Sequence, residues 1–79
     1  MANSNELISR AISVRLARIG KTQREVAEES GVNPATFSRK MNNRADWQVC
    51  FLDKISPALG LSGAIDIIAS AQQEAALAA

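Results

Sequence analysis

Apolar residues recur at three- and four-residue intervals along most of the chain, and this spacing is typical of helices that bury one face. The first such run predicts a helix from about Ser4 to Ile19. Asn3 and Glu6 stand at the spacing of a capping box at its start, and Gly20 is placed to end it. The chain is therefore expected to begin with a long amphipathic helix.

The next segment, TQREVAEESGVNPATFSRKMN from Thr22 to Asn42, predicts two short helices joined by a tight turn. Thr22 can cap the first of them, which should extend from Gln23 to Ser30. Gly31 follows, and glycine ends a helix in the left-handed conformation without a steric penalty.

The second helix of the pair should start where Asn33 supplies an N-cap side chain and Pro34 supplies a first-turn residue with a suitable φ. Val32 should fill the corner, while Phe37 and Met41 should face the two preceding helices. The predicted arrangement is a helix-turn-helix, whose second helix reads DNA in the major groove.

After a polar break at residues 42–44, the chain predicts a fourth helix that Asp46 can cap. This helix carries Trp47 and Cys50, which we expect in the core, with the cysteine chemically inert there. A proline and a glycine then limit or bend the helix.

The last helical segment should begin at Ser62 and is rich in alanine. Ile65, Ile67 and Ile68 spread over more than one stripe of this helix, so packing by one face would leave isoleucine in water. We therefore predict that these three residues mediate oligomerisation. The alternative is packing at the edge of the core that leaves Ile67 exposed.

Composition narrows the fold class. The 79 residues are 47% hydrophobic and 4% aromatic, and they include no tyrosine and no histidine. Together with the helical spacing, this composition predicts an all-α fold of four to five short helices. We expect a helix-turn-helix DNA-binding domain in residues 1–60 and an oligomerisation helix with a short tail in residues 61–79.

The residue types that the chain lacks argue against an enzyme. The chain has no histidine, no Cys/His cluster, no glycine-rich phosphate loop and no nucleophile beside a base, so we expect no catalytic residue, metal or cofactor. A single cysteine, the lack of a signal peptide and the lack of an apolar run near 20 residues predict a cytoplasmic protein without a membrane span.

The charges are unevenly distributed, although the net charge is only +1. Residues 1–44 hold eight lysines and arginines against four acidic residues, whereas residues 45–79 hold one lysine against four acidic residues. A basic N-terminal part and an acidic C-terminal part are typical of a protein that places one end on phosphates. An ordinary solvated surface is the alternative.

Two sets of residues are candidates for contact with double-stranded DNA. In a major groove, the Arg39 guanidinium can pair with a guanine edge, and Ser38 can bond several bases. The predicted base contacts are Pro34, Ala35, Thr36, Ser38 and Arg39. The predicted phosphate contacts are Lys21, Gln23, Arg24, Lys40, Asn42 and Arg44. The alternative is that these residues only form the polar face of a helix pair.

The residues of the predicted helix-turn-helix resemble those of a known family. Gln23, Ala27, Gly31, Val32 and Phe37 resemble the helix-turn-helix of the lambda-repressor-like superfamily, over a segment of about 20 residues. A closer resemblance is to the CII transcription activators of lambdoid phages. It rests on the stretch AEESGVNPATFSRKM, the tryptophan-containing fourth helix, the short glycine-containing link and the terminal helix.

The resemblance to CII implies a homotetramer, arranged as a pair of dimers, that binds direct repeats about one DNA turn apart. It also implies recruitment of RNA polymerase to promoters in the bacterial cell, in the control of bacteriophage lysogeny. Lys40 departs from the pattern, because such helices usually carry an apolar residue at this position. The departure bears on the contacts of Lys40 and Asn42 more than on those of Ala35, Ser38 and Arg39.

The chain ends in Ala76, Leu77, Ala78 and Ala79, which resemble the end of the bacterial ribosome-rescue tag. ATP-dependent proteases recognise that tag as a free, uncharged tail, and CII activators are likewise short-lived. A degradation signal is one interpretation of this tail. The frayed end of an alanine-rich helix is the other.

Two other functions remain open. A Cro- or repressor-like dimer would use the same reading helix on a palindromic operator, and the symmetry of the operator would distinguish it from the activator. A helical protein-interaction module, such as an antitoxin or an adaptor, would keep the shape of a helix-turn-helix without binding DNA.

Overall fold

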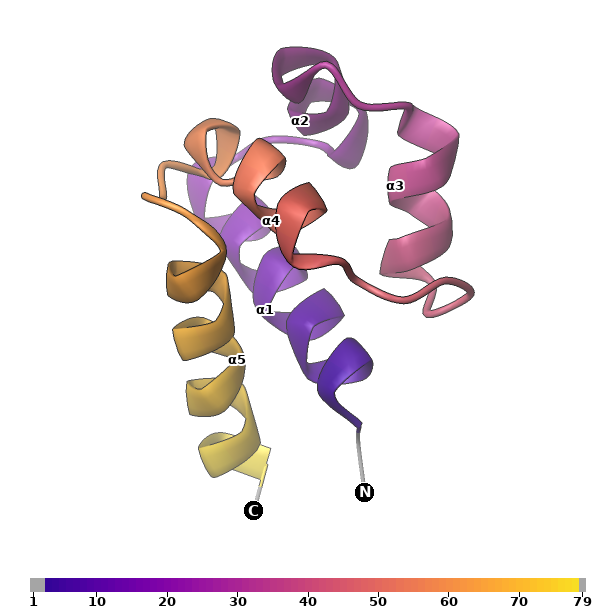
Figure 1. Ribbon diagram of the computed structural model, residues 1–79. Helices are drawn as coiled ribbons and strands as arrows, with labels where there is room; N and C mark the ends of the chain where they lie inside the picture. The colour runs from indigo at the N-terminus through magenta and orange to yellow at the C-terminus, as the bar shows by residue number, and fades with distance from the viewer. Residues whose placement is uncertain (1–2, 79) are drawn as a thin grey trace.

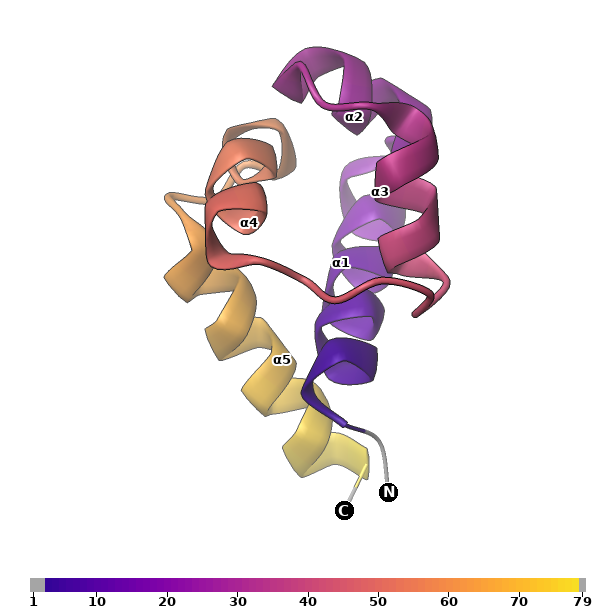
Figure 2. The same cartoon turned by 45° about the vertical axis from the view of Figure 1, so that its right-hand side comes forward.

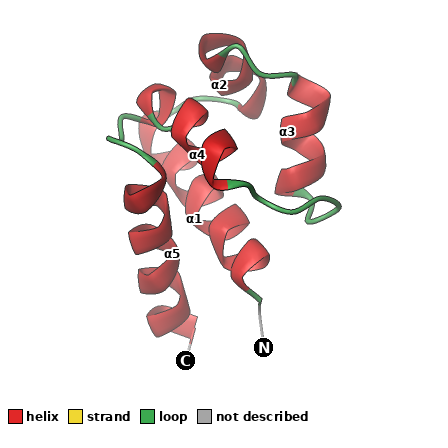
Figure 3. Ribbon diagram, in the orientation of Figure 1, coloured by secondary structure: helices red, strands yellow, loops and turns green. Residues whose placement is uncertain are grey.

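Residues 3–78, which this computed structural model describes, form five α-helices and one 3-10 helix (Figure 1). They are α1 (Ser4–Ile19), α2 (Gln23–Ser30), α3 (Pro34–Met41), α4 (Val49–Ile55), η1 (Pro57–Leu59) and α5 (Ala64–Ala78). Figure 3 shows helices and loops but no strand in this part of the chain. The predicted all-α class is confirmed.

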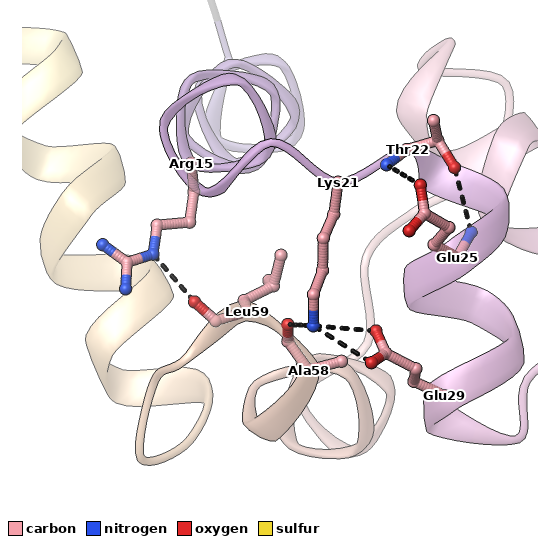
Figure 4. Close-up of polar contacts among 7 residues, drawn as sticks. All are labelled: Arg15, Lys21, Thr22, Glu25, Glu29, Ala58 and Leu59. Atoms are coloured by element: carbon pink, nitrogen blue, oxygen red, sulfur yellow. Dashed lines mark hydrogen bonds and ion pairs between the residues drawn. The ribbon is translucent and has the colours of Figure 1, made fainter.

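Side-chain caps explain where the first helices begin. Asn3 Oδ1 accepts a hydrogen bond from the backbone N–H of Glu6 at 2.9 Å, and α1 ends at Gly20, whose φ is 70°. At α2, the Thr22 hydroxyl accepts from the N–H of Glu25 at 3.1 Å, and the Glu25 carboxylate accepts from the N–H of Thr22 at 3.2 Å (Figure 4). Both bonds of a capping box are therefore present.

The turn between α2 and α3 depends on the backbone freedom of Gly31, which has a φ of 71°. The N–H of Val32 donates to the carbonyl of Ala27 at 3.0 Å, and the N–H of Gly31 donates to that of Glu28 at 3.3 Å. These two bonds form a Schellman motif. A Cβ at this glycine would meet nothing within 4 Å, so the backbone conformation rather than lack of space favours glycine.

All five α-helices and η1 contribute to the core, and α1 and α5 run antiparallel beside each other (Figures 1 and 2). Trp47 is 9% exposed, which confirms its predicted place in the core. Its ring lies 5.9 Å from that of Phe37 and 6.0 Å from that of Phe51, measured between centroids. The core residues are Ile12, Leu16, Val26, Ala27, Phe37, Trp47, Leu52, Ile55, Leu59, Ala64 and Ile67.

The fourth helix starts later than its sequence indicates. It begins at Val49, after an N-cap residue that makes no side-chain cap, so the prediction that Asp46 caps it is wrong. Instead, Asp46 Oδ1 accepts from Asn5 Nδ2 at 2.9 Å, and the N–H of Trp47 donates to Asn5 Oδ1 at 2.9 Å. These tertiary bonds to α1 hold the preceding loop in an extended conformation.

The predicted burial of Cys50 is also wrong, since this residue is exposed. The helix α4 has only seven residues, and it buries Leu52 and Ile55, which are three positions apart. At 100° per residue, that choice of face turns Cys50 outward and leaves Val49 62% exposed.

The terminal helix begins at Ala64, two residues after the predicted start. Its first turn is held by α4, because Asp53 Oδ1 accepts from the N–H of Ala64 at 2.8 Å. Ala64, Ile67 and Ala71 form its buried face, and Ile67 is 1% exposed. The prediction that Ile67 lies in an oligomer interface is therefore wrong, because the chain's own core covers it.

Candidate nucleic-acid interface

Helix α3 lies on the opposite side of the molecule from α5 (Figure 1). It buries Phe37 and Lys40 and leaves Met41 partly buried. Of the predicted base contacts, Ser38 is half-buried and the others, Pro34, Ala35, Thr36 and Arg39, are exposed. The structure thus brings all five predicted base contacts together on the accessible surface of one helix.

The helical repeat explains how these side chains share a face. At 100° per residue, Pro34, Ala35, Ser38 and Arg39 fall within an arc of about 140°, and Asn42 falls inside the same arc. Thr36 is exposed but lies about 60° beyond this arc, on the side toward Lys40. The face has one strong cation, at Arg39, flanked by small side chains that allow close approach to another surface.

The start of α3 is held by its own N-cap. Asn33 Oδ1 accepts from the N–H of Ala35 at 2.8 Å and from that of Thr36 at 3.3 Å. Because Pro34 has no N–H to satisfy, the first turn of the helix has few free donors. These local bonds fix the position of the residues with which α3 begins.

A polar groove of about 400 Å³ lies where α1 meets the beginning of α2 and the end of α3. Two predicted phosphate contacts, Gln23 and Asn42, lie on it, and both are exposed. Helix α1 adds Arg10 and Ser13, which the sequence analysis did not select, together with Ser9 and the acidic Glu6. The helical spacing of Arg10 and Ser13 shows that they face outward, but only the packing of α1 places them beside Gln23 and Asn42.

Two of the predicted phosphate contacts, Arg44 and Arg24, are exposed cations. Arg44 follows α3 in the turn, and Arg24 lies on α2. Arg24 forms an ion pair with Glu28 at 3.1 Å, but both side chains are largely exposed, so this pair is weak and easily exchanged for another partner.

Lys21, which is half-buried, bonds to other residues of the protein. Its Nζ lies 2.9 Å from a Glu29 carboxylate oxygen and donates to the carbonyl of Ala58 at 3.1 Å (Figure 4). Nearby, Arg15 Nε donates to the carbonyl of Leu59 at 2.8 Å. These bonds fasten η1 to α1 and α2. The Lys21 ammonium thus has partners within the protein, and its contact with a DNA phosphate stays a prediction.

Lys40, another predicted phosphate contact, is buried. Its side chain is 6% exposed, and its Nζ donates to the carbonyl of Asp46 at 2.7 Å while lying 5.0 Å from the centroid of the Phe51 ring. The residue follows the buried Phe37 by three positions, so it faces inward and its methylene groups pack in the core. The prediction that Lys40 contacts a DNA phosphate is wrong.

On the opposite side, α5 exposes two of its isoleucines. Ile65 is 79% exposed and Ile68 is 37% exposed. Ile68 borders a mainly apolar groove of about 210 Å³ that also includes Leu7 and Ile8 of α1. The prediction that Ile65 and Ile68 mediate oligomerisation stays a prediction.

The tail continues α5. Ala76 and Leu77 belong to its last turns and are exposed, Leu77 by 81%. The side chain of Ala78 and the whole of Ala79 lie outside the described residues. The degradation signal stays a prediction. Within residues 3–78, no group of three potential metal ligands occurs, and no helix is long and apolar enough to cross a membrane.

The arrangement of the helices matches that in the crystal structure of the clp gene regulator ClgR from Corynebacterium glutamicum, with a TM-score of 0.82. The fold is similar to that of a gene regulator. The sequence identity with ClgR is 29%, and the match covers 96% of this chain and 80% of that one. No protein-family model and no curated protein matches the chain.

Proposed function

We propose that this protein is a sequence-specific regulator of transcription that binds double-stranded DNA through α3. The observation that carries the proposal is the division of this helix into two faces. Phe37 and Lys40 anchor it in the core, while Pro34, Ala35, Ser38 and Arg39 are presented outward. The similarity to ClgR, a regulator of clp genes, supports this assignment.

In the proposed complex, α3 lies in the major groove with Arg39 directed at a base edge. The planar guanidinium suits guanine, whose N7 and O6 it can bond together, and one such contact discriminates by about 1–3 kcal/mol. Ser38 would add a hydrogen bond, and the methyl groups of Ala35 and Thr36 would contact thymine.

The phosphate contacts are revised by the geometry. We propose Gln23, Arg24, Asn42 and Arg44 from the predicted set, with Arg10 of α1 in addition. Gln23, Asn42 and Arg10 line one groove, so a single phosphate backbone can reach all three. Lys21 and Lys40 are left out, because their charges are already engaged within the protein.

Within this class we propose a CII-type activator that binds direct repeats as a homotetramer and recruits RNA polymerase in the bacterial cytoplasm. Its support is the sequence resemblance and the place of the exposed isoleucines on α5, on the side away from α3. One side of the molecule could then contact DNA while the other contacts a second copy. The exposed tail, at Ala76 and Leu77, would be recognised by an ATP-dependent protease.

The test is selection from random DNA duplexes with purified protein at about 0.15 M salt, where nonspecific attraction is already screened. We expect an enriched sequence. Arg39→Ala should reduce affinity for that sequence by about 1–3 kcal/mol and relax the choice of base at one position. Arg18→Ala is the matched control, since Arg18 is an exposed arginine that lies beside α5 rather than α3.

The arrangement of the enriched sequence distinguishes the finer proposals. Tandem repeats one helical turn apart would support the CII-type activator, whereas an inverted repeat would support a Cro- or repressor-like dimer. If no sequence is enriched, the DNA-binding function is rejected and a protein-interaction module takes its place.

A further inference from the structure

The end of α3 has an unusual residue in a conformation that normally favours glycine. Asn43 has a φ of 61° and is the one non-glycine residue with a positive φ in the described part of the chain. The N–H of Asn43 donates to the carbonyl of Lys40 at 3.0 Å, and that of Arg44 donates to the carbonyl of Arg39 at 2.9 Å. These bonds form a Schellman motif, as at the end of α2, where the same position is a glycine.

The Asn43 side chain makes a hydrogen bond that glycine, which has no side chain, could not make. Its Oδ1 accepts from the hydroxyl of Ser9 on α1 at 2.7 Å. The carbonyl of Lys40 lies 3.2 Å from the same hydroxyl, as a longer alternative acceptor. Because a serine hydroxyl has only one proton, the shorter bond to Asn43 is the stronger one.

The Ser9 hydroxyl also accepts a hydrogen bond, from the indole Nε1–H of Trp47 at 2.9 Å. Ser9 is 6% exposed, so little water reaches its hydroxyl, whereas Asn43 itself is exposed. Its side chain thus joins three segments: α1, the turn that ends α3, and the residue that leads into α4. Figure 2 shows the loop between α3 and α4 passing in front of α1.

The two ends of α3 are held in different ways. Its first turn is fixed by neighbours in the sequence, through the Asn33 cap and the turn that begins at Gly31. Its last turn is fixed by α1, through Ser9 and Asn43. The outward-facing residues Ala35, Ser38 and Arg39 lie between these two points, so the second contact contributes, with the buried Phe37 and Lys40, to the angle at which the face is presented.

We infer that Ser9 and Asn43 are positioning residues for DNA reading, although neither needs to touch a base. The inference rests on the proposed function. The Ser9–Asn43 bond holds the far end of α3 against α1, which aligns Arg39 with a base edge while the phosphate contacts hold the protein on the duplex. Loss of the bond should reduce discrimination between the enriched sequence and random DNA more than it reduces attraction to random DNA.

The decisive variant is Asn43→Gly. Glycine accepts the positive φ without strain, so the backbone turn should persist and the protein should fold. The Asn43 side-chain acceptor for Ser9 is lost, and only the longer contact with the Lys40 carbonyl remains. Asn43→Asp is the matched control for the helix angle, because it keeps a side-chain oxygen at the same place; its added charge in the polar groove excludes it from the DNA measurement. Ser9→Ala removes the bond from the other partner but also leaves the buried indole N–H of Trp47 without its acceptor, so Asn43→Gly is the more specific variant.

The first measurement does not involve DNA. Residual dipolar couplings give the angle between α1 and α3, and the indole N–H signal of the single tryptophan reports its bond to Ser9. We expect the angle to change in Asn43→Gly and Ser9→Ala and to be retained in Asn43→Asp. An unchanged angle in the first two variants would overturn the positioning role, whatever the protein binds.

The second measurement is the affinity ratio between the enriched duplex and a random duplex. We expect Asn43→Gly and Ser9→Ala to lower this ratio about three- to tenfold, the size expected from one neutral hydrogen bond. A changed angle with an unchanged ratio would overturn the role in reading. If the wild-type protein enriches no sequence, the proposed function is rejected, and with it the role of Ser9 and Asn43 in DNA reading. The role of these two residues in docking α3 on α1 would stand.

Discussion

The ammonium group of Lys40 lies inside the protein although the residue belongs to the helix proposed to face DNA. Its hydrogen bond to the carbonyl of Asp46 and its position near the Phe51 ring draw it away from the outer surface. By contrast, the exposed cation Arg44 follows only four residues later. Two cations so close in sequence are therefore expected to have different roles, one in stability and one in DNA affinity.

Replacing each cation separates these roles. Lys40→Met keeps the length of the buried stem and removes the charged hydrogen bond, so it should lower the free energy of unfolding by about 1 kcal/mol. It should leave the dependence of DNA affinity on salt unchanged. Arg44→Ala should leave stability nearly unchanged and reduce the slope of log K against log salt by about 0.9, as expected for one lost phosphate contact.

The measurements are urea denaturation for stability and DNA titrations at several salt concentrations for the slope. A reduction of the slope by Lys40→Met as large as that by Arg44→Ala would mean that the lysine leaves its buried position to bind a phosphate. That result would restore Lys40 to the interface.

At the scale of the element, α3 is defined by short-range chemistry at its start and by tertiary contacts at its end. Asn33 supplies the cap, Pro34 has a fixed φ, and Gly31 allows the preceding helix to end. All three are local effects that can be identified without knowledge of the rest of the fold. The short length of the helix makes its cap important, because eight residues form too few internal bonds to be stable alone.

Removal of the cap should therefore lower stability. Asn33→Ala leaves the N–H groups of Ala35 and Thr36 without their acceptor and should cost about 1 kcal/mol in the free energy of unfolding. Asn33→Asp keeps the acceptor and places a negative charge at the positive end of the helix, so stability should be maintained or increased. The same aspartate should weaken DNA binding, because it brings a negative charge close to the phosphates.

Urea denaturation and DNA titration of the two variants test these directions. A loss of stability in Asn33→Asp equal to that in Asn33→Ala would contradict the capping role. Unchanged DNA affinity in Asn33→Asp would place the start of α3 away from the duplex.

At the scale of the whole molecule, the division of α5 between core and surface decides which residues can meet a second copy. Ile67 packs inside, whereas Ile65 and Ile68 remain on the outside. The groove beside Ile68 is lined by Leu7, Ile8 and other residues of α1 and α5, so both helices would contribute to an interface there. Burial of this surface in an oligomer would remove isoleucine from water.

Ile68→Asp should therefore dissociate the proposed oligomer, because a carboxylate in an apolar interface loses its hydration without gaining a partner. Light scattering should show a molar mass close to that of the monomer, and circular dichroism should show that the helices remain. Val49→Asp is the matched control, since Val49 is 62% exposed and lies on α4. Equal masses for Ile68→Asp and the unaltered protein would rule out an interface at this position.

Much of the fold follows from the sequence because it is encoded by near neighbours. The spacing of apolar residues predicts the helices, and the caps at Asn3, Thr22 and Asn33 and the glycines that follow α1 and α2 predict their ends. The structure has α1 and α2 with the predicted bounds and α3 within one residue of its predicted start. The outward face of α3 could be predicted for the same reason, since it depends on the phase of one helix relative to Phe37.

The remaining features of the fold depend on contacts between residues far apart in the chain. Asn5 competes with helix formation at Trp47, so α4 starts later than its own residues indicate. The polar groove, with Arg10 beside Gln23, exists only once α1 is packed against α2 and α3. Likewise, the inward position of Lys40 and the burial of Ile67 depend on which face each helix turns toward its neighbours. Local spacing determines that a helix has an inner face, but packing against other helices decides which side chains occupy it.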